Sequence, residues 1–275
     1  MKKLLAVVLA VLMLGGVFAV GASASPVDIT AKFTDAIFKE AVYGYIGKTA
    51  PAPIYDTDVA GVKVLHLNSI LEPEKIKTLA GLEYFTGLQE LNCANNELTS
   101  LPALPPGLTK IYCAANQLTS LPILPSGLET LWCFGNKLTS LPALPLTLND
   151  LDCSNNQLIS LPVLTPALKF LSCSYNKLIS LPALPSTLEA LNCANNQLAN
   201  IDVTGLSLTR LDCRENYLPN KAAVKGFTGT WDGKNFIFDP QNSTPSPQLP
   251  PTPSFIANVW NFILRYLFFG FLWMK

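Results

Sequence analysis

The sequence predicts a solenoid dominated by β-structure, in which short parallel strands from successive turns of the chain stack side by side. The first observation is a fixed period, because the seven cysteines stand 20 residues apart, at Cys93, Cys113, Cys133, Cys153, Cys173, Cys193 and Cys213. The second is the pattern LxxLxCxxNxL around each cysteine, and the third is a pair of prolines between most copies, as in LPALP at residues 101–105. Self-similarity at a fixed period is the signature of a repeat architecture whose units stack on one another.

The strands are predicted from alternation within each copy. Leu91 and Cys93 flank Asn92, which is the period of a strand with one face turned inward. The segment VKVLHLNSI, residues 62–70, repeats this pattern with Leu65 and Leu67 in the inward positions. We therefore expect about eight short parallel strands and a repeat region over residues 62–218.

The motif LxxLxCxxNxL, with Cys at the third apolar position, is the leucine-rich repeat signature. Prolines in the return segment remove backbone donors and fix φ, so neither a helix nor a central strand fits there. A period of 20 is short for this class and leaves no room for a helix. The expected fold is an α/β-type solenoid dominated by β: a right-handed leucine-rich repeat with strands on the concave face, an extended proline-rich convex side and a small helical N-terminal cap.

One asparagine per repeat stands where the chain turns out of the strand. Its side-chain amide can satisfy backbone groups that would otherwise be buried unpaired, at about 1–3 kcal/mol each. Stacking would align these side chains into a ladder: Asn96, Asn116, Asn136, Asn156, Asn176, Asn196 and Asn216. None has Ser or Thr two residues on, so none is a glycosylation sequon.

The cysteines allow four interpretations: disulfides, metal ligands, reactive thiols or core. One thiol per strand gives a line of sulfurs rather than a tetrahedron, and no His or second Cys stands nearby to complete a metal site. Seven is odd, and in-register neighbours are about 4.8 Å apart, wider than the roughly 3.8 Å between the Cβ atoms of a disulfide. A reactive thiol needs exposure and a positive neighbourhood. We therefore expect seven reduced cysteines that serve as small apolar core residues.

Both ends of a solenoid need covering. Residues 25–61 carry Phe33, Ile37, Phe38 and Val42 at helical spacing, which predicts a helical N-terminal cap. Residues 219–240 are the predicted C-terminal cap. There Asn220 is positioned to start a short helix over KAAVKGF, and aromatic residues are available to close the open end: Trp231, Phe236 and Phe238.

The chain begins like a secretory signal peptide. Lys2 and Lys3 precede an apolar run that ends at the small-residue sequence Ala22-Ser23-Ala24. Residues 1–24 are therefore predicted to direct export, and an uncleaved N-terminal anchor is the alternative. Without them the chain has 17 basic and 19 acidic residues, which provides no basic surface for nucleic acid.

The C-terminal residues predict a tether. Residues 241–254 are rich in Pro, Ser, Thr and Gln, as in a semi-rigid linker. They lead into a hydrophobic tail at 255–275 that is long enough to span a bilayer, although Arg265 lies near its middle. A polar stripe runs through Ser254, Asn258, Asn261 and Arg265. The open alternatives are a tilted span, an interfacial anchor, a helix that pairs with a copy of itself, and a buried core helix.

The candidate binding site lies among residues that flank the inward positions and so face the concave surface. Aromatic side chains gather there on neighbouring strands, with two carboxylates among them: Tyr112, Trp132, Phe134, Asp150, Asp152, Phe170 and Tyr175. Aromatic residues are enriched in interface hot spots. The alternatives are scattered surface aromatics or cover from a cap. Asp150 and Asp152 are not accompanied by a nucleophile motif, so we expect no catalysis, no cofactor and no metal.

Several segments carry a family resemblance. The sequences GLEYFTGLQELNC (81–93) and NIDVTGLSLTRLDC (200–213), with the cysteine column, resemble bacterial internalin-like surface proteins that have a cysteine ladder. The return segment LTSLPALPPGL (98–108) is similar to the short repeats of bacterial secreted effectors. The resemblance covers about residues 28–240 and is specific for fold. Some of those effectors append a ubiquitin-ligase domain with a catalytic cysteine, but every cysteine here lies in the repeats.

Taken together, these features predict an exported bacterial protein, tethered at the extracellular face of the membrane or cell surface, that binds a protein or glycan partner on its concave face. No sortase-type motif is evident, so the hydrophobic tail would provide the attachment. The alternative is a structural envelope protein, in which the solenoid is a spacer and the tail mediates anchoring or self-assembly.

Overall fold

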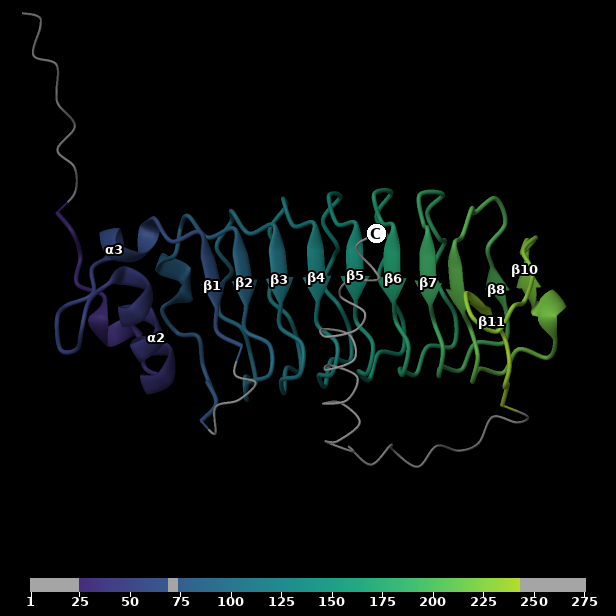
Figure 1. The fold of residues 1–275 in the computed structure, drawn as a ribbon, viewed down its shortest axis with the longest axis horizontal. Coiled ribbons are helices and arrows are strands. Elements are labelled where there is room, and N and C mark those ends of the chain that lie inside the picture. Colours follow the sequence, from purple (N-terminus) through teal and green to yellow (C-terminus); the bar gives the residue numbers. More distant parts are fainter. Residues whose placement is uncertain (1–24, 69–73, 243–275) are drawn as a thin grey trace, which may run out of the picture.

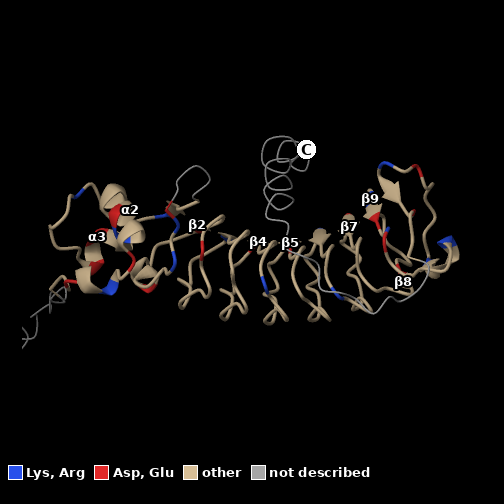
Figure 2. Cartoon of the chain, turned by 90° about the horizontal axis from the view of Figure 1, so that it is seen from below, with Lys and Arg blue, Asp and Glu red and all other residues tan. Residues whose placement is uncertain are grey.

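The computed structural model describes residues 25–68 and 74–242. The predicted signal peptide and tail, and the linker beyond residue 242, lie outside the described residues. Within them the chain forms a leucine-rich repeat β-solenoid of about seven turns with a small helical cap at its N-terminal end, as predicted (Figure 1). The strands lie on the inner side of a shallow arc, and the charged residues are concentrated toward its two ends (Figure 2).

The main sheet of the described residues has nine parallel strands, which are the eight expected in residues 62–218 and a ninth, β11, from the C-terminal cap. In sheet order they are β1 (Val64–His66), β2 (Glu90–Asn92), β3 (Lys110–Tyr112), β4 (Thr130–Trp132), β5 (Asp150–Asp152), β6 (Phe170–Ser172), β7 (Ala190–Asn192), β9 (Arg210–Asp212) and β11 (Phe236–Ile237). From β2 to β9 every pairing joins residues 20 apart, so that Leu91 pairs with Ile111 and Ile111 with Leu131. This strict register places equivalent side chains of successive repeats in columns.

A second sheet forms where the repeat sequence changes. The segment NIDVTGLSL lacks the prolines of the other return segments, so its backbone donors remain available. There β8 (Ile201–Asp202) pairs in parallel with β10 (Val224–Lys225). The predicted helix over KAAVKGF is much shorter than expected. Asn220 caps a single 3-10 turn, η3 (Lys221–Ala223), and the chain then enters β10.

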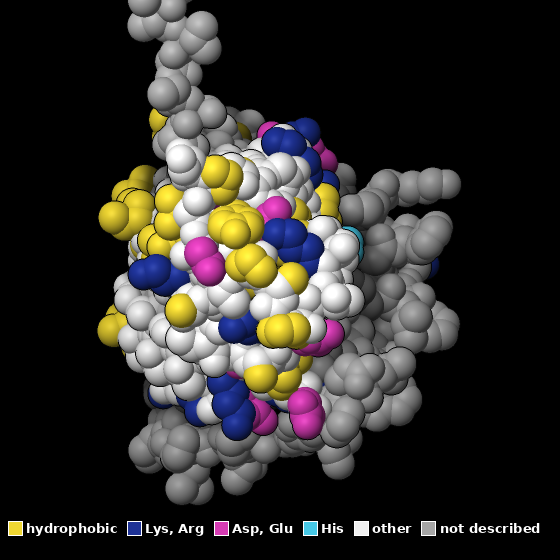
Figure 3. Space-filling view, turned by 90° about the vertical axis from the view of Figure 1, so that its left-hand side faces the viewer, with side chains coloured by type: hydrophobic (Ala, Val, Ile, Leu, Met, Phe, Trp, Pro, Cys, Tyr) yellow, Lys and Arg dark blue, Asp and Glu magenta, His cyan; other side chains and the backbone are white. Residues whose placement is uncertain are grey.

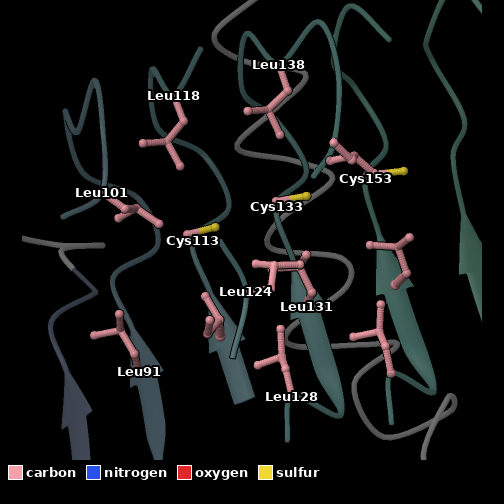
Figure 4. Close-up of a cluster of buried hydrophobic side chains, with 14 of the residues drawn as sticks. Leu91, Leu101, Cys113, Leu118, Leu124, Leu128, Leu131, Cys133, Leu138 and Cys153 are labelled. Atoms are coloured by element: carbon pink, nitrogen blue, oxygen red, sulfur yellow. The ribbon is translucent and has the colours of Figure 1, made fainter. Parts of the chain in front are cut away.

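The core consists of leucine and cysteine columns between the sheet and the return segments. The central residue of each strand from β2 to β9 is at most 1% exposed. Figure 4 shows the sulfur atoms of Cys113, Cys133 and Cys153 among leucine side chains of successive turns. Each fully buried leucine contributes about 1.5–3 kcal/mol through burial alone, so the repeated pattern accounts for the stability of the stack.

The cysteine ladder is present as predicted. All seven cysteines are free and 0% exposed. Burial away from water disfavours the thiolate, and it raises the pKa of Cys113 to about 12. The pKa values of Cys93, Cys133, Cys153 and Cys193 are likewise raised well above the ordinary range by burial. These thiols are packing residues.

Each asparagine of the ladder links its own turn to the preceding one. The Asn156 Nδ2 donates to the carbonyl oxygens of Cys133 and Cys153, both at 3.1 Å. Its Oδ1 accepts a 2.9 Å bond from the backbone N–H of Leu138. The same arrangement recurs along the stack, for example at Asn116 and Asn196. Every buried turn is therefore completed by a side chain from the next repeat.

The N-terminal cap closes the first turn with η1 (Thr30–Lys32), α2 (Ala36–Ile46), α3 (Asp56–Ala60) and η2 (Leu82–Tyr84). Of the residues expected to be on the helix, Phe38 and Val42 are buried and Ile37 is partly buried, while Phe33 precedes α2. The Phe33 ring lies 5.6 Å from Phe38. Gly81 has a φ of 102°, and a Cβ there would lie 2.7 Å from the Phe33 ring, so only glycine fits this approach.

A single carboxylate fastens this cap to the repeats. Asp35 Oδ1 accepts from the backbone N–H groups of Ile37 and Phe38 at the start of α2, both at 3.0 Å. Its Oδ2 accepts a 2.8 Å bond from the N–H of Lys77. Figure 3 looks onto this end, where hydrophobic side chains are interspersed with charged ones.

The C-terminal cap contributes both aromatic packing and a hydrogen-bonding end group. Trp231 packs against Phe227 and Phe238, at ring distances of 4.2 and 5.4 Å. Gln241 Oε1 accepts from the N–H of Asn216 at 3.1 Å, and its Nε2 donates to the carbonyl of Cys213 at 3.0 Å. Gln241 thus takes the place that an asparagine of a further repeat would occupy. The linker predicted to begin at 241 therefore starts too early, because residues 241 and 242 still bond to the last repeat.

Candidate binding surface

The predicted concave site centres on two aromatic side chains at the ends of neighbouring strands. Tyr112 of β3 and Trp132 of β4 are in register, and their rings meet edge to face at 5.1 Å and 74°. Trp132 Nε1 donates a 3.1 Å hydrogen bond to Asp150 Oδ2 on β5. The structure therefore brings Tyr112, Trp132 and Asp150 together in the middle of the sheet, and all three side chains are half-buried.

The other predicted residues have different surroundings. Phe134 is only 8% exposed and packs over Ala94 and Ala114, so it supports Trp132 more than it offers surface. Asp152 is 7% exposed and accepts from the hydroxyl of Ser154. Phe170 of β6 pairs in register with Asp150. Tyr175 is 55% exposed and lies beyond β6, away from the strands themselves. Of the five aromatic residues predicted at this site, Phe134 is buried, which reduces the aromatic surface that a partner could reach.

A shallow groove lies along the edge of the concave face where the chain leaves the strands, and we refer to it as the turn groove. It encloses about 190 Å³. Its walls come from six successive strand-to-turn segments and combine hydroxyl, amide, aromatic and charged side chains: Ala115, Phe134, Gly135, Ser154, Asn155, Ser174, Tyr175, Asn192, Ala194, Asn195, Asp212 and Arg214. Sequence reasoning selected only Phe134 and Tyr175 of this set. The column two residues after each cysteine would have indicated Ala115, Gly135, Asn155 and Asn195, and the remaining residues stand directly before or directly after a cysteine.

The backbone explains why this column lines a groove. Residues at this position adopt the left-handed conformation in each cysteine repeat, for example Asn155 at φ 52° and Tyr175 at φ 54°. Their N–H groups continue the pairing beyond the strands, as in the 2.9 Å bond from Tyr175 to the Ala194 carbonyl. The side chains are thereby aligned along the edge of the sheet.

The charged residues of the turn groove are one pair at its C-terminal end. Arg214 Nη2 lies 3.0 Å from Asp212 Oδ2. Burial raises the pKa of Asp212, and the Arg214 charge partly opposes this rise. Elsewhere on the sheet, Lys110 lies 3.9 Å from Glu90 and His66 lies 3.1 Å from the same carboxylate. Opposite charges are thus adjacent in the Arg214–Asp212 and Lys110–Glu90 pairs.

Two further properties concern metal binding and membrane spans. Among the described residues there is no group of three or more His, Cys, Asp or Glu side chains that could hold a metal ion. No helix within residues 25–68 and 74–242 is long and apolar enough to cross a bilayer.

The fold and its columns of leucine, cysteine and asparagine side chains define the class of protein, which is a leucine-rich repeat solenoid with a buried cysteine ladder. No protein-family model matches the sequence, and no curated protein matches it. Among solved structures it is similar to the functional domain of InlJ from Listeria monocytogenes, which includes a cysteine ladder, with 28% identity, a TM-score of 0.58, and coverage of 70% of this chain and 48% of that one. It is also similar to the leucine-rich effector YopM from Yersinia pestis, with 34% identity, a TM-score of 0.52, and coverage of 58% and 44%.

A third similar structure is the leucine-rich repeat domain of a Shigella effector, with 32% identity, a TM-score of 0.48, and coverage of 65% of this chain and 84% of that one. By its fold and repeat pattern the protein is a bacterial leucine-rich repeat protein that resembles internalins of the InlJ type and effectors of the YopM type. This type of fold is generally non-catalytic and offers a protein-binding surface. The chain spans less than half the length of the InlJ and YopM structures.

Proposed function

We propose that the protein is exported, is tethered to the membrane through residues 255–275, and binds a protein partner on the concave face around Tyr112 and Trp132. The observation that carries the binding proposal is the edge-to-face pair of these rings, joined to Asp150 by the Trp132 indole. Tyr and Trp supply large contact areas with few rotatable bonds, and such residues carry most of the energy in many interfaces.

Strand geometry supports this site over a catalytic one. The strands are short and the register is strict, so the pair is held on a rigid surface rather than on a loop. Opposite charges flank it, which suits partner recognition through complementary groups. Export and surface location are supported by the signal-like sequence at 1–24 and by the relationship to internalins and effectors.

Partner capture tests the binding site. The full chain and a variant with both Tyr112→Ser and Trp132→Ser would be used to capture partners, and the dissociation constant of each captured partner would be measured. Loss of one hot-spot residue costs about 2 kcal/mol, or about 30-fold in Kd, so the double variant should bind at least 30-fold more weakly.

Ile123→Ser is the matched control. It also removes an apolar side chain, but Ile123 lies on a return segment and is 90% exposed there. Its affinity should equal that of the unaltered chain. If the double variant retains full affinity for every partner, the concave site is wrong and the spacer role of the solenoid is favoured.

A flotation experiment tests the tether separately. The full chain should rise with phospholipid vesicles in a density gradient, and a variant lacking residues 255–275 should remain at the bottom. A truncated chain that still floats contradicts the proposal.

A further inference from the structure

The turn groove is long enough to hold several units of an extended chain molecule. It passes from the turn after β3 to the turn after β9, across five strand spacings in the sheet. At about 4.8 Å for each spacing it is roughly 24 Å long. Its volume of about 190 Å³ is small for that length, so it is narrow and shallow. An extended chain molecule fits this shape, and a compact ligand that must be deeply buried does not.

The walls offer two kinds of contact side by side. Tyr175 supplies an exposed aromatic ring, and Ala115 and Ala194 supply small apolar surfaces. Between them stand the hydroxyls of Ser154 and Ser174 and the amides of three asparagines, Asn155, Asn192 and Asn195. Backbone N–H groups at this level are already used in pairing, as in the 2.8 Å bond from Asn155 to the Ser174 carbonyl. Recognition must therefore come from the side chains.

The charge of the turn groove excludes strongly ionic ligands. Its cation, Arg214, is paired with Asp212 at 3.0 Å, so the lining is neutral overall. A phosphate or an acidic polymer would have to compete with that carboxylate. The ligand expected from these walls has many hydroxyl groups, apolar C–H faces and no net charge, which is the chemistry of a neutral oligosaccharide.

Tyr175 provides an independent indication of function. Its backbone is left-handed, with φ 54°, and this conformation is strained for a bulky side chain. In the other repeats this position holds Asn95, Asn155, Asn195 and Gly135, which tolerate the conformation, and also Ala115 and Glu215, so Tyr175 is the one aromatic residue in the column. Tyrosine also leaves its ring 55% exposed instead of packing it into the core. A residue that is unfavourable for the local fold and lines a groove is a candidate for ligand contact.

We propose that the turn groove binds a neutral oligosaccharide. The Tyr175 ring packs against the C–H face of a sugar, as the electron-rich face of an aromatic ring favours. Ser174, which precedes Tyr175 in the chain, and Asn195, the equivalent residue of the next repeat, exchange hydrogen bonds with sugar hydroxyls. Its centre at Tyr175 differs from the Tyr112–Trp132 pair, and Phe134, which packs beside Trp132, borders both surfaces, so the protein would have two adjoining binding surfaces on one face.

The test uses the full chain in micelles of a detergent that has no sugar headgroup. Binding to an array of immobilised neutral oligosaccharides would be followed by saturation-transfer NMR with cellotetraose, chitotetraose and mannotetraose in solution. The variant Tyr175→Asn introduces the residue that three other repeats carry at this position. It should lose at least tenfold in affinity, while its melting temperature should equal or exceed that of the unaltered chain. Tyr175→Phe keeps the ring and should retain most of the affinity.

The controls separate this proposal from the protein-binding site. Tyr112→Ser alters a side chain outside the turn groove and should bind saccharide normally, and Tyr175→Asn should bind the protein partner normally. If the unaltered chain binds no neutral saccharide at millimolar concentration, the proposal is wrong. It is equally wrong if Tyr175→Asn binds saccharide as well as the unaltered chain does. If the binding lost in Tyr175→Asn is that of a protein, the turn groove belongs to the protein interface instead.

Discussion

Replacement of one ladder asparagine should cost far more stability than a surface substitution in the same turn. In Asn156→Ala, the N–H of Leu138 loses its 2.9 Å acceptor, and the carbonyls of Cys133 and Cys153 lose donors at 3.1 Å. Asn156 is 9% exposed, so water cannot readily replace these bonds. A buried group left unpaired costs about 1–3 kcal/mol. The two carbonyls keep bonds from Asn136 and Asn176, at 3.0 and 3.1 Å, so the Leu138 N–H is the group left unpaired and we expect a loss of about 1–3 kcal/mol.

The assay is equilibrium unfolding by urea, followed by circular dichroism. The neighbouring substitution Gln157→Ala serves as the control, because Gln157 is exposed and its replacement should change the unfolding free energy by less than about 0.5 kcal/mol. In a solenoid each repeat contacts only its neighbours, so Asn156→Ala should also broaden the transition as the two halves uncouple. A loss below about 1 kcal/mol with an unchanged slope would refute the view that the ladder holds the turns together.

Three other outcomes follow from the structure. Because burial raises the pKa of Cys113 to about 12, iodoacetamide at pH 8 should label the native cysteines only as fast as the protein unfolds, and rapid labelling would contradict their core position. Asp35→Ala should lower stability by about 1–2 kcal/mol, since it removes the cap of α2 and the bond to Lys77, whereas Asp35→Asn should recover part of the loss in thermal unfolding. NMR titration should find the pKa of Asp212 above the usual value of 3.8, and Arg214→Ala should raise this pKa further. Because folding raises the pKa, ionisation of Asp212 destabilises the folded state as the pH rises above about 4. A pKa of Asp212 below the usual value would refute this reasoning.

The repeats could be predicted from sequence because each position has one strong physical reason. A 20-residue spacing of Leu91, Cys93 and Asn96 leaves little freedom in strand register, core composition or turn structure. The ends obey no such period. The parallel strand β11 and the replacement of a ladder asparagine by Gln241 depend on contacts across about 25 residues, and no local pattern signals them. The absence of prolines at 200–208 indicates that this return segment differs from the others, but it does not predict that β8 pairs with β10.

The candidate site was only partly predictable for a related reason. Strand alternation placed Tyr112, Trp132 and Asp150 on one face, and their contacts follow from adjacency in the sheet. The burial of Phe134 depends on the small side chains of Ala94 and Ala114 in the two preceding repeats, which leave room for its ring. The turn groove depends on left-handed residues beyond the strands, where the alternation no longer tells which way a side chain points.

Those hydrogen bonds of the asparagine ladder that join two repeats all run from one repeat to the repeat before it, and only the two ends are unlike the rest. The repeats between Asn96 and Gln241 are thus equivalent units, and each supplies the side-chain hydrogen bonds that complete the turn of the repeat before it. Because the repeats share one pattern, insertion or removal of a 20-residue unit would still leave every turn completed. The length of the concave face can therefore change by whole repeats, whereas a chain cut before Gln241 would end on an open turn.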